Sequence, residues 1–216
     1  VRVMSANAEM KSGATELPRF DGVPPGDGKC LIVARGAGEP QKVLEANQSG
    51  ASELSCVVQD YLRHSKIQIF EVNQTFVLED YPEKIMCVLN QMRLQEIYSR
   101  SLSPDFSIVT AQSRFSRLPG KPELFQYPCS LGPTKIGKGV IRIPQYEAGQ
   151  YAIALAVCLG YREILLGGFE GYADGDHNVR MNEFFTELGN QVPDLSLIFV
   201  TPTHYQGVQK RSLYTY

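Results

Sequence analysis

The chain has 216 residues, of which 43% are hydrophobic and 20% are charged, a composition typical of a folded globular domain rather than a disordered chain. Its formal net charge of −2 argues against the long basic surface that duplex nucleic acid normally requires, whereas a nucleotide or another small anion remains compatible. The apolar stretches are too short to span a membrane and no signal-peptide pattern opens the chain, so we expect a soluble, cytoplasmic protein.

The five cysteines are widely spaced, and no two of them form a Cys-x-x-Cys pair. An odd number of cysteines in mostly apolar segments is typical of reduced thiols in an intracellular protein. The sequence therefore predicts neither a disulfide framework nor a metal site built on cysteine.

The first half of the chain begins with residues 1–28, whose small and turn-forming residues predict a linker or an arm, so the domain itself is expected over residues 29–216. Cys30–Ala34 is apolar and is followed by the glycine-containing segment Arg35–Gly38, a pattern typical of a buried parallel strand that enters a tight loop. The further elements expected here are strands at 67–72, 85–89 and 106–110, helices at 41–46 and 93–98, and either form at 54–62.

The second half contains the clearest helix of the sequence. Residues 113–143 are rich in Pro, Gly and basic residues, which predicts mostly loops with one edge strand at most. Tyr146–Leu159 is apolar nearly all round, which predicts a buried helix, and Gly160 is a residue type that commonly ends helices. The remaining elements are a strand at 163–167, a helix at 181–188 and a strand at 197–200.

Strands that alternate with helices predict an α/β fold with a doubly wound, mostly parallel sheet, that is, a single Rossmann-like domain. In such sheets ligands bind outside the carboxyl ends of the strands. We therefore expect five segments to face one rim of the sheet: Arg35–Gly38, Asn73, Asn90, Gly168–Tyr172 and Thr201–Thr203.

Four residues of this rim suit a nucleotide. Gly36 and Gly38 would let backbone N–H groups approach a phosphate or a ribose, although two glycines also occur in plain turns. The amides of Asn73 and Asn90 can donate to and accept from a nucleobase or a ribose hydroxyl, although asparagine also ends strands because it tolerates turns. For each pair the ligand interpretation and the structural interpretation remain open.

The segments after the last two long strands supply candidates for contacts with a sugar or a phosphate, which are Glu170, Tyr172, Thr201 and Thr203. The carboxylate of Glu170 suits a sugar hydroxyl or Mg²⁺, and a solvated loop acid is the alternative. His177 follows acidic residues, and an imidazole there is a candidate general base near neutral pH, with an ordinary surface histidine as the alternative.

The segment Gly149–Tyr172 resembles bacterial sialyltransferases of glycosyltransferase family 42, and also a wider group that includes 6-hydroxymethylpterin pyrophosphokinases and domains that follow aldolase-like barrels. The shared pattern is an Ala-rich helix, the motif Leu159-Gly-Tyr-Arg-Glu-Ile164, and an apolar strand that closes on Gly168-Phe-Glu-Gly-Tyr172. The other strands and their loops agree in order and spacing, so the resemblance covers about residues 29–214.

This resemblance implies that Gly36, Asn73, Asn90 and Tyr172 help to hold a CMP-linked donor sugar, in a reaction that needs no metal or other cofactor. Two departures from the sialyltransferases stand out. The first loop reads Arg35-Gly-Ala-Gly38 rather than Asn-Gly-Pro-Ser, and Glu147-Ala148 replaces the Thr-Ser that precedes the helix glycine. The lid that carries the sialyltransferase base is also shortened, so nucleotide binding is implied more strongly than sialyl transfer.

Three functions are compatible with these features. The first is a glycosyltransferase-like enzyme that transfers a CMP-activated acidic sugar, a sialic acid or a related ulosonate, to a hydroxyl acceptor with His177 as the base. The second is a non-catalytic nucleotide-sensing or assembly domain, with an upstream aldolase-like domain or a second copy of the chain as its partner. The third is Mg²⁺-dependent transfer of diphosphate from a nucleoside triphosphate to a pterin-like alcohol.

Overall fold

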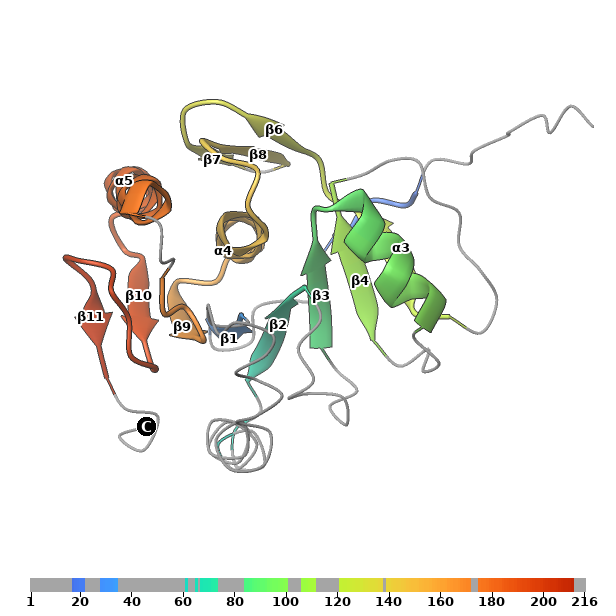
Figure 1. Cartoon of the computed structure of the whole chain (residues 1–216), viewed down its shortest axis with the longest axis horizontal. Helices are drawn as coiled ribbons and strands as arrows, with labels where there is room; N and C mark the ends of the chain where they lie inside the picture. Colours follow the sequence, from blue (N-terminus) through green and yellow to red (C-terminus); the bar gives the residue numbers. More distant parts are fainter. Residues whose placement is uncertain are drawn as a thin grey trace, which may run out of the picture.

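The central element is an eight-stranded sheet with the order β11-β10-β9-β1-β2-β3-β4-β5, in which neighbouring strands are parallel (Figure 1). Its strands are β1 Lys29–Val33, β2 Gln68–Val72, β3 Lys84–Val88, β4 Ser107–Thr110, β5 Glu123–Gln126, β9 Glu163–Gly167, β10 Ser196–Phe199 and β11 Gln209–Lys210. The computed structural model describes residues 17–21, 28–34, 61, 65, 67–73, 84–100, 106–111, 121–137, 139–171 and 175–211.

Apolar layers cover both faces of this sheet, which explains why its inner strands are nearly continuous apolar runs. Helix α3 (Gln91–Arg100) packs on one face, and helices α4 (Ala148–Cys158) and α5 (Gly175–Gln191) pack on the other. The two charged side chains buried within the strands neutralise each other, because Lys84 Nζ lies 2.8 Å from a carboxylate oxygen of Glu71 on the adjacent strand.

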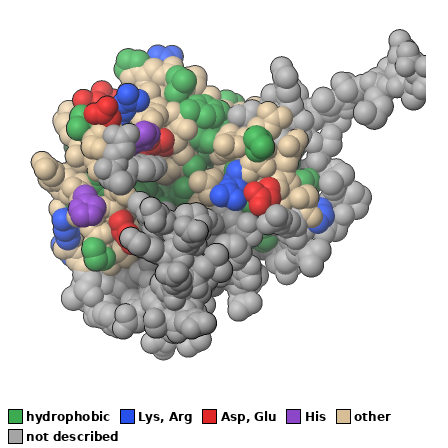
Figure 2. Space-filling view, viewed as in Figure 1, with side chains coloured by type: hydrophobic (Ala, Val, Ile, Leu, Met, Phe, Trp, Pro, Cys, Tyr) green, Lys and Arg blue, Asp and Glu red, His purple; other side chains and the backbone are tan. Residues whose placement is uncertain are grey.

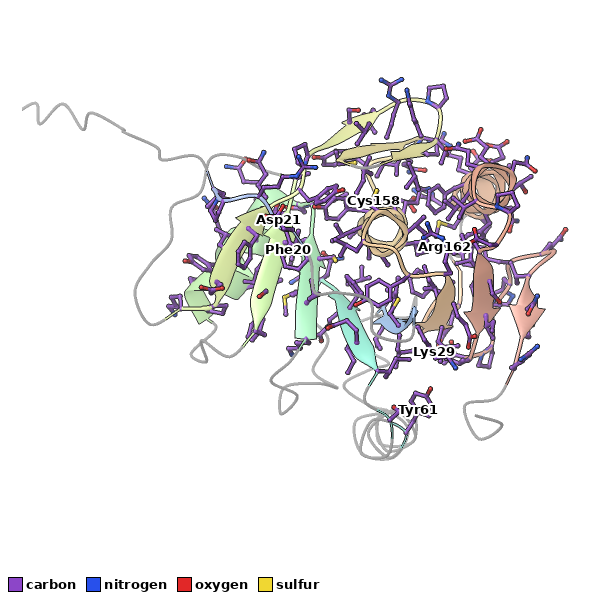
Figure 3. All side chains as sticks on the ribbon, turned by 180° about the vertical axis from the view of Figure 1, so that it is seen from behind. Phe20, Asp21, Lys29, Tyr61, Cys158 and Arg162 are labelled. Atoms are coloured by element: carbon purple, nitrogen blue, oxygen red, sulfur yellow. The ribbon has the colours of Figure 1, made fainter. Side chains whose placement is uncertain are left out.

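Helix α4 is enclosed because a second sheet covers the side that faces away from the first (Figure 1). This small sheet has the order β6-β8-β7, with β6 at Cys129–Leu131, β7 at Lys135–Gly137 and β8 at Val140–Ile143. Cys158, the last residue of α4, contacts the small sheet, because its thiol lies 3.3 Å from the carbonyl oxygen of Gly137 (Figure 3). On the face drawn in Figure 2, hydrophobic side chains gather over α4 and the small sheet, and charged ones lie over α5.

The end of α4 confirms the role predicted for Gly160. This glycine has a φ of 100°, and its N–H donates to the carbonyl of Val157. The N–H of Tyr161 donates to the carbonyl of Ala156, which completes a Schellman motif. The helix therefore stops where the chain must turn at once into β9.

The predicted fold class is confirmed, since the structure has a mostly parallel sheet with helices on both faces in one α/β domain. In the described part of 113–143 the expected edge strand is confirmed as β5, at one end of the large sheet, but the prediction missed β6, β7 and β8. These three strands have only three or four residues each and form the half-exposed small sheet, so none gives a long apolar run. Strand β11 was missed for the same reason.

Two boundaries also differ from the prediction. Helix α5 begins at Gly175 rather than at residue 181, so that His177 lies in the first turn of a helix and not in a loop. Leu17 and Phe20 are buried. The N–H of Phe20 donates to the carbonyl of Gln126 in β5, and the N–H of Gln126 donates to the carbonyl of Pro18, so this part of the expected arm packs onto the core. The elements expected at 41–46 and 54–62 lie outside the described residues, apart from Tyr61.

Within the described parts, no helix is long and apolar enough to cross a membrane.

Candidate functional site

The strand order reverses direction at β1, and a pocket lies at this point. The chain passes from β1 outward through β2 to β5 on one side, then returns to place β9 on the other side of β1. Carboxyl ends at such a reversal leave a crevice where α/β proteins bind ligands. The pocket has a volume of about 130 Å³. It is lined by Ala34 after β1, Val72 and Asn73 at the end of β2, Glu147–Gly149 at the start of α4, Gly168–Gly171 after β9, Met181 of α5, and Tyr205.

One wall of the pocket is the first turn of α4. The first helical hydrogen bond runs from the N–H of Tyr151 to the carbonyl of Glu147, so the N–H groups of Ala148 and Gly149 precede the intrahelical bonds. These groups carry the partial positive charge of the helix N-terminus. Since both residues line the pocket, the wall favours a negatively charged group such as a phosphate.

The lack of a side chain at Gly149 allows a close contact in this wall. A Cβ at this position would lie 3.1 Å from the ring of Phe169, which is buried and also lines the pocket. The ring of Phe169 packs edge-to-face on that of Phe199 in β10. The glycine therefore lets the loop after β9 pack directly against the start of α4.

The opposite rim is held together by hydrogen bonds between the loops after β9 and β10. The N–H of Gly168 donates to Thr201 Oγ1 at 2.9 Å, and the N–H of His204 donates to the carbonyl of Glu170 at 2.8 Å. Gly171 has a φ of 106°, and a Cβ there would lie 3.0 Å from Asn178 Oδ1 of α5. The rim is thus fixed to both β10 and α5.

Asn73 lies directly after β2 with a φ of 56°, a left-handed conformation that asparagine tolerates better than most residues. Its N–H donates to the carbonyl of Cys87 at 3.1 Å, which holds the residue against β3. The half-buried Asn73 lines the pocket and carries both a hydrogen-bond donor and an acceptor.

Glu147 is the half-buried carboxylate of the pocket. Its Oε1 is enclosed and has no hydrogen-bond partner within the described part of the chain. Burial raises the pKa of Glu147 above its ordinary value, and the positive charges of His177 and Arg180 on α5 act in the opposite direction. Glu170, the second carboxylate of the lining, is exposed on the rim.

The structure brings Asn73 and Glu170 into the pocket and gives the other described candidates different surroundings. The exposed Asn90 caps α3, because its Oδ1 accepts hydrogen bonds from the N–H groups of Met92 and Arg93 at 2.9 and 3.2 Å. His177 does not line the pocket, although it lies one turn before Met181, which does, and its charge acts on Glu147.

Thr201 and Thr203 are absent from the pocket lining, and both hydroxyls accept hydrogen bonds from loop N–H groups. The predicted contacts Gly36, Gly38 and Tyr172 lie outside the described residues. Among the residues that are described, no group of three or more His, Cys, Asp or Glu could hold a metal ion.

The sequence interpretation missed the contribution of Glu147 to the site. Its signal was present in the sequence, because Glu147 is an acid that directly precedes the apolar helix. Met181 and Tyr205 were also missed, since an apolar helix residue and a loop tyrosine look like ordinary core residues.

No protein-family model matches this chain, and no curated protein matches it significantly in sequence. The pocket at the start of α4 therefore carries the functional proposal, together with the sequence pattern of Gly149–Tyr172.

Proposed function

We propose that this domain binds a CMP-activated acidic sugar in the pocket at the start of α4 and transfers the sugar to a hydroxyl acceptor. The observation that carries the proposal is the position of the pocket, where the strand order reverses and the first turn of a helix faces the same space. The resemblance of Gly149–Tyr172 to the family 42 sialyltransferases supports CMP as the nucleotide.

Each part of such a donor has suitable chemistry in the lining. The N–H groups of Ala148 and Gly149 suit the phosphate, the amide of Asn73 suits the ribose or the base, and the carboxylate of Glu170 suits a sugar hydroxyl. The positive charge of Arg180 on α5 acts on the carboxylate of Glu147 and reduces the repulsion between that carboxylate and the phosphate.

Calorimetry with CMP, CDP, ATP and GTP, each with and without Mg²⁺, tests this proposal. Binding of CMP that does not depend on Mg²⁺ is the expected result, because the start of α4 supplies the positive end that a metal otherwise provides. Asn90→Asp is a matched control, because aspartate preserves the cap of α3 and the residue does not line the pocket. Its affinity for CMP should equal that of the parent chain.

Two other outcomes would replace the proposal. Binding of ATP or GTP only in the presence of Mg²⁺ would indicate the diphosphotransferase. CMP binding without any release of CMP from a CMP-sugar would indicate the nucleotide-sensing domain. Absence of binding by all four nucleotides would contradict both enzyme functions.

A further inference from the structure

The position of Glu147 would normally be explained as helix capping, and the structure does not support that explanation. Glu147 is the N-cap residue of α4, with an extended backbone at φ −111° and ψ 134°. Its side chain makes no capping hydrogen bond to the first turn. Its carboxylate is therefore available for another purpose.

The surroundings of the carboxylate suit proton transfer. Glu147 lines the pocket, and its Oε1 is enclosed without a hydrogen-bond partner in the described residues. His177 and Arg180 on α5 act to lower the pKa of Glu147, against the larger effect of burial. Among the described residues, the titratable and charged groups that act on Glu147 or line the pocket with it are His177 and Arg180 on α5, Glu170 on the rim, and Tyr205 after β10. A half-buried carboxylate that lines a pocket and has a raised pKa is suited to accept a proton from a bound hydroxyl group.

We propose that Glu147 is the catalytic base of the pocket, and that His177 is a positioning residue which acts through the charge of Glu147. This inference rests on the proposed function, and it assigns to Glu147 the role that the sequence interpretation gave to His177. The geometric reason is that Glu147 lines the pocket, whereas His177 does not.

In the proposed step, the hydroxyl group of the acceptor loses its proton to the carboxylate of Glu147. The oxygen of the acceptor forms a bond to the anomeric carbon, the bond from that carbon to the phosphate oxygen breaks, and its electron pair leaves with CMP. The protonated Glu147 returns its proton to solvent after the products depart.

Release of CMP from CMP-sialic acid, with water as the acceptor, is the probe reaction, and CMP affinity is measured on the same samples. Glu147→Gln should melt no earlier than the parent and should bind CMP at least as tightly, yet it should lower CMP release by about 100-fold or more, the range lost with a general base. Glu147→Asp should recover part of the rate. Glu183→Gln, on an exposed part of α5 outside the pocket, should behave like the parent.

The pH profile separates the two roles. His177→Gln should retain substantial CMP release but move the acid limb of the rate to higher pH, because the charge that lowers the pKa of Glu147 is lost. Full activity of Glu147→Gln, or loss of activity in His177→Gln without movement of the acid limb, would overturn the assignment. CMP binding by the parent without CMP release would also overturn it, whereas absence of CMP binding would contradict the proposed function itself.

Discussion

Asn73 combines a left-handed backbone with a side chain that faces the pocket, and substitution can separate these two properties. Asn73→Gly keeps the backbone conformation and removes the side chain with its amide. CMP affinity should then fall by about 2- to 10-fold, the effect of one hydrogen bond. Asn73→Ala should lose the same affinity and also about 1 kcal/mol of stability relative to Asn73→Gly, because alanine is strained at this φ.

Calorimetry with CMP and urea denaturation measure both effects. Unchanged affinity in the two variants would show that the amide of Asn73 does not contact the nucleotide.

Asn73 was predicted as a site residue because polar residues after parallel strands are frequent ligands. The same pattern also selected Asn90, whose amide caps α3 instead, because a helix begins directly after it.

At Glu147 the raised pKa has a consequence for folding. Since the pKa is higher in the folded chain than in the unfolded one, the folded state binds its proton more tightly, and the resulting stabilisation disappears as the pH rises through the folded-state pKa. At neutral pH the ionised carboxylate is therefore a cost to stability. Glu147→Gln should be more stable than the parent at neutral pH.

Urea denaturation over a series of pH values tests this expectation. The advantage of Glu147→Gln should shrink as the pH falls toward the ordinary pKa of a glutamate, because the parent then carries a neutral side chain as well. An advantage that does not vary with pH would mean that burial of the charge is not its cause.

At the scale of elements, the hydroxyl of Thr201 joins the loop after β9 to the end of β10. Thr201 is buried, so Thr201→Val would leave the N–H of Gly168 without its partner at a cost of about 1–3 kcal/mol. Thr201→Ser keeps the hydroxyl and should cost less than about 1 kcal/mol. Equal stability of the two variants in urea would show that this hydrogen bond does not hold the rim.

The elements differ in how well the sequence could predict them. The apolar periodicity of α4 and its terminal glycine predicted a buried helix, which is confirmed. Strands β6 to β8 have no comparable signal, because only one face of their small sheet is buried, against α4. Likewise, the polar residues at the start of α5, from Gly175 to Asn178, are typical of a loop, and their helical conformation depends on the folded surroundings.

At the scale of the whole molecule, Leu17 and Phe20 add to the core, with Phe20 beside β5, which sequence composition could not reveal (Figure 3). The ring of Phe20 lies edge-to-face on that of Phe125 at 5.3 Å. Phe20→Ala should therefore cost about 3–5 kcal/mol in urea denaturation, as for other buried aromatic side chains. Asp21 is an exposed neighbour, so the free energy of unfolding of Asp21→Ala should stay within about 0.5 kcal/mol of that of the parent. An equally small loss for Phe20→Ala would show that this segment is an arm that does not contribute to the core.

The order of strands and helices was sufficient to predict a doubly wound sheet and the edge at which the pocket lies. It could not predict that the start of α4 is the wall of the pocket, because that depends on how the chain returns from β8 to β9 across β1. Glu147 and Tyr205 enter the pocket only through this tertiary arrangement.

The central claim is that CMP binds where the start of α4 meets the carboxyl ends of β1 and β9. Addition of CMP to ¹⁵N-labelled protein without Mg²⁺, followed by amide NMR, tests it most directly. We predict that the amide resonances of Ala148, Gly149 and Gly168 move in a saturable manner, while that of Asn90 does not. Saturable binding that leaves the first three unchanged, or no binding at all, would contradict the account.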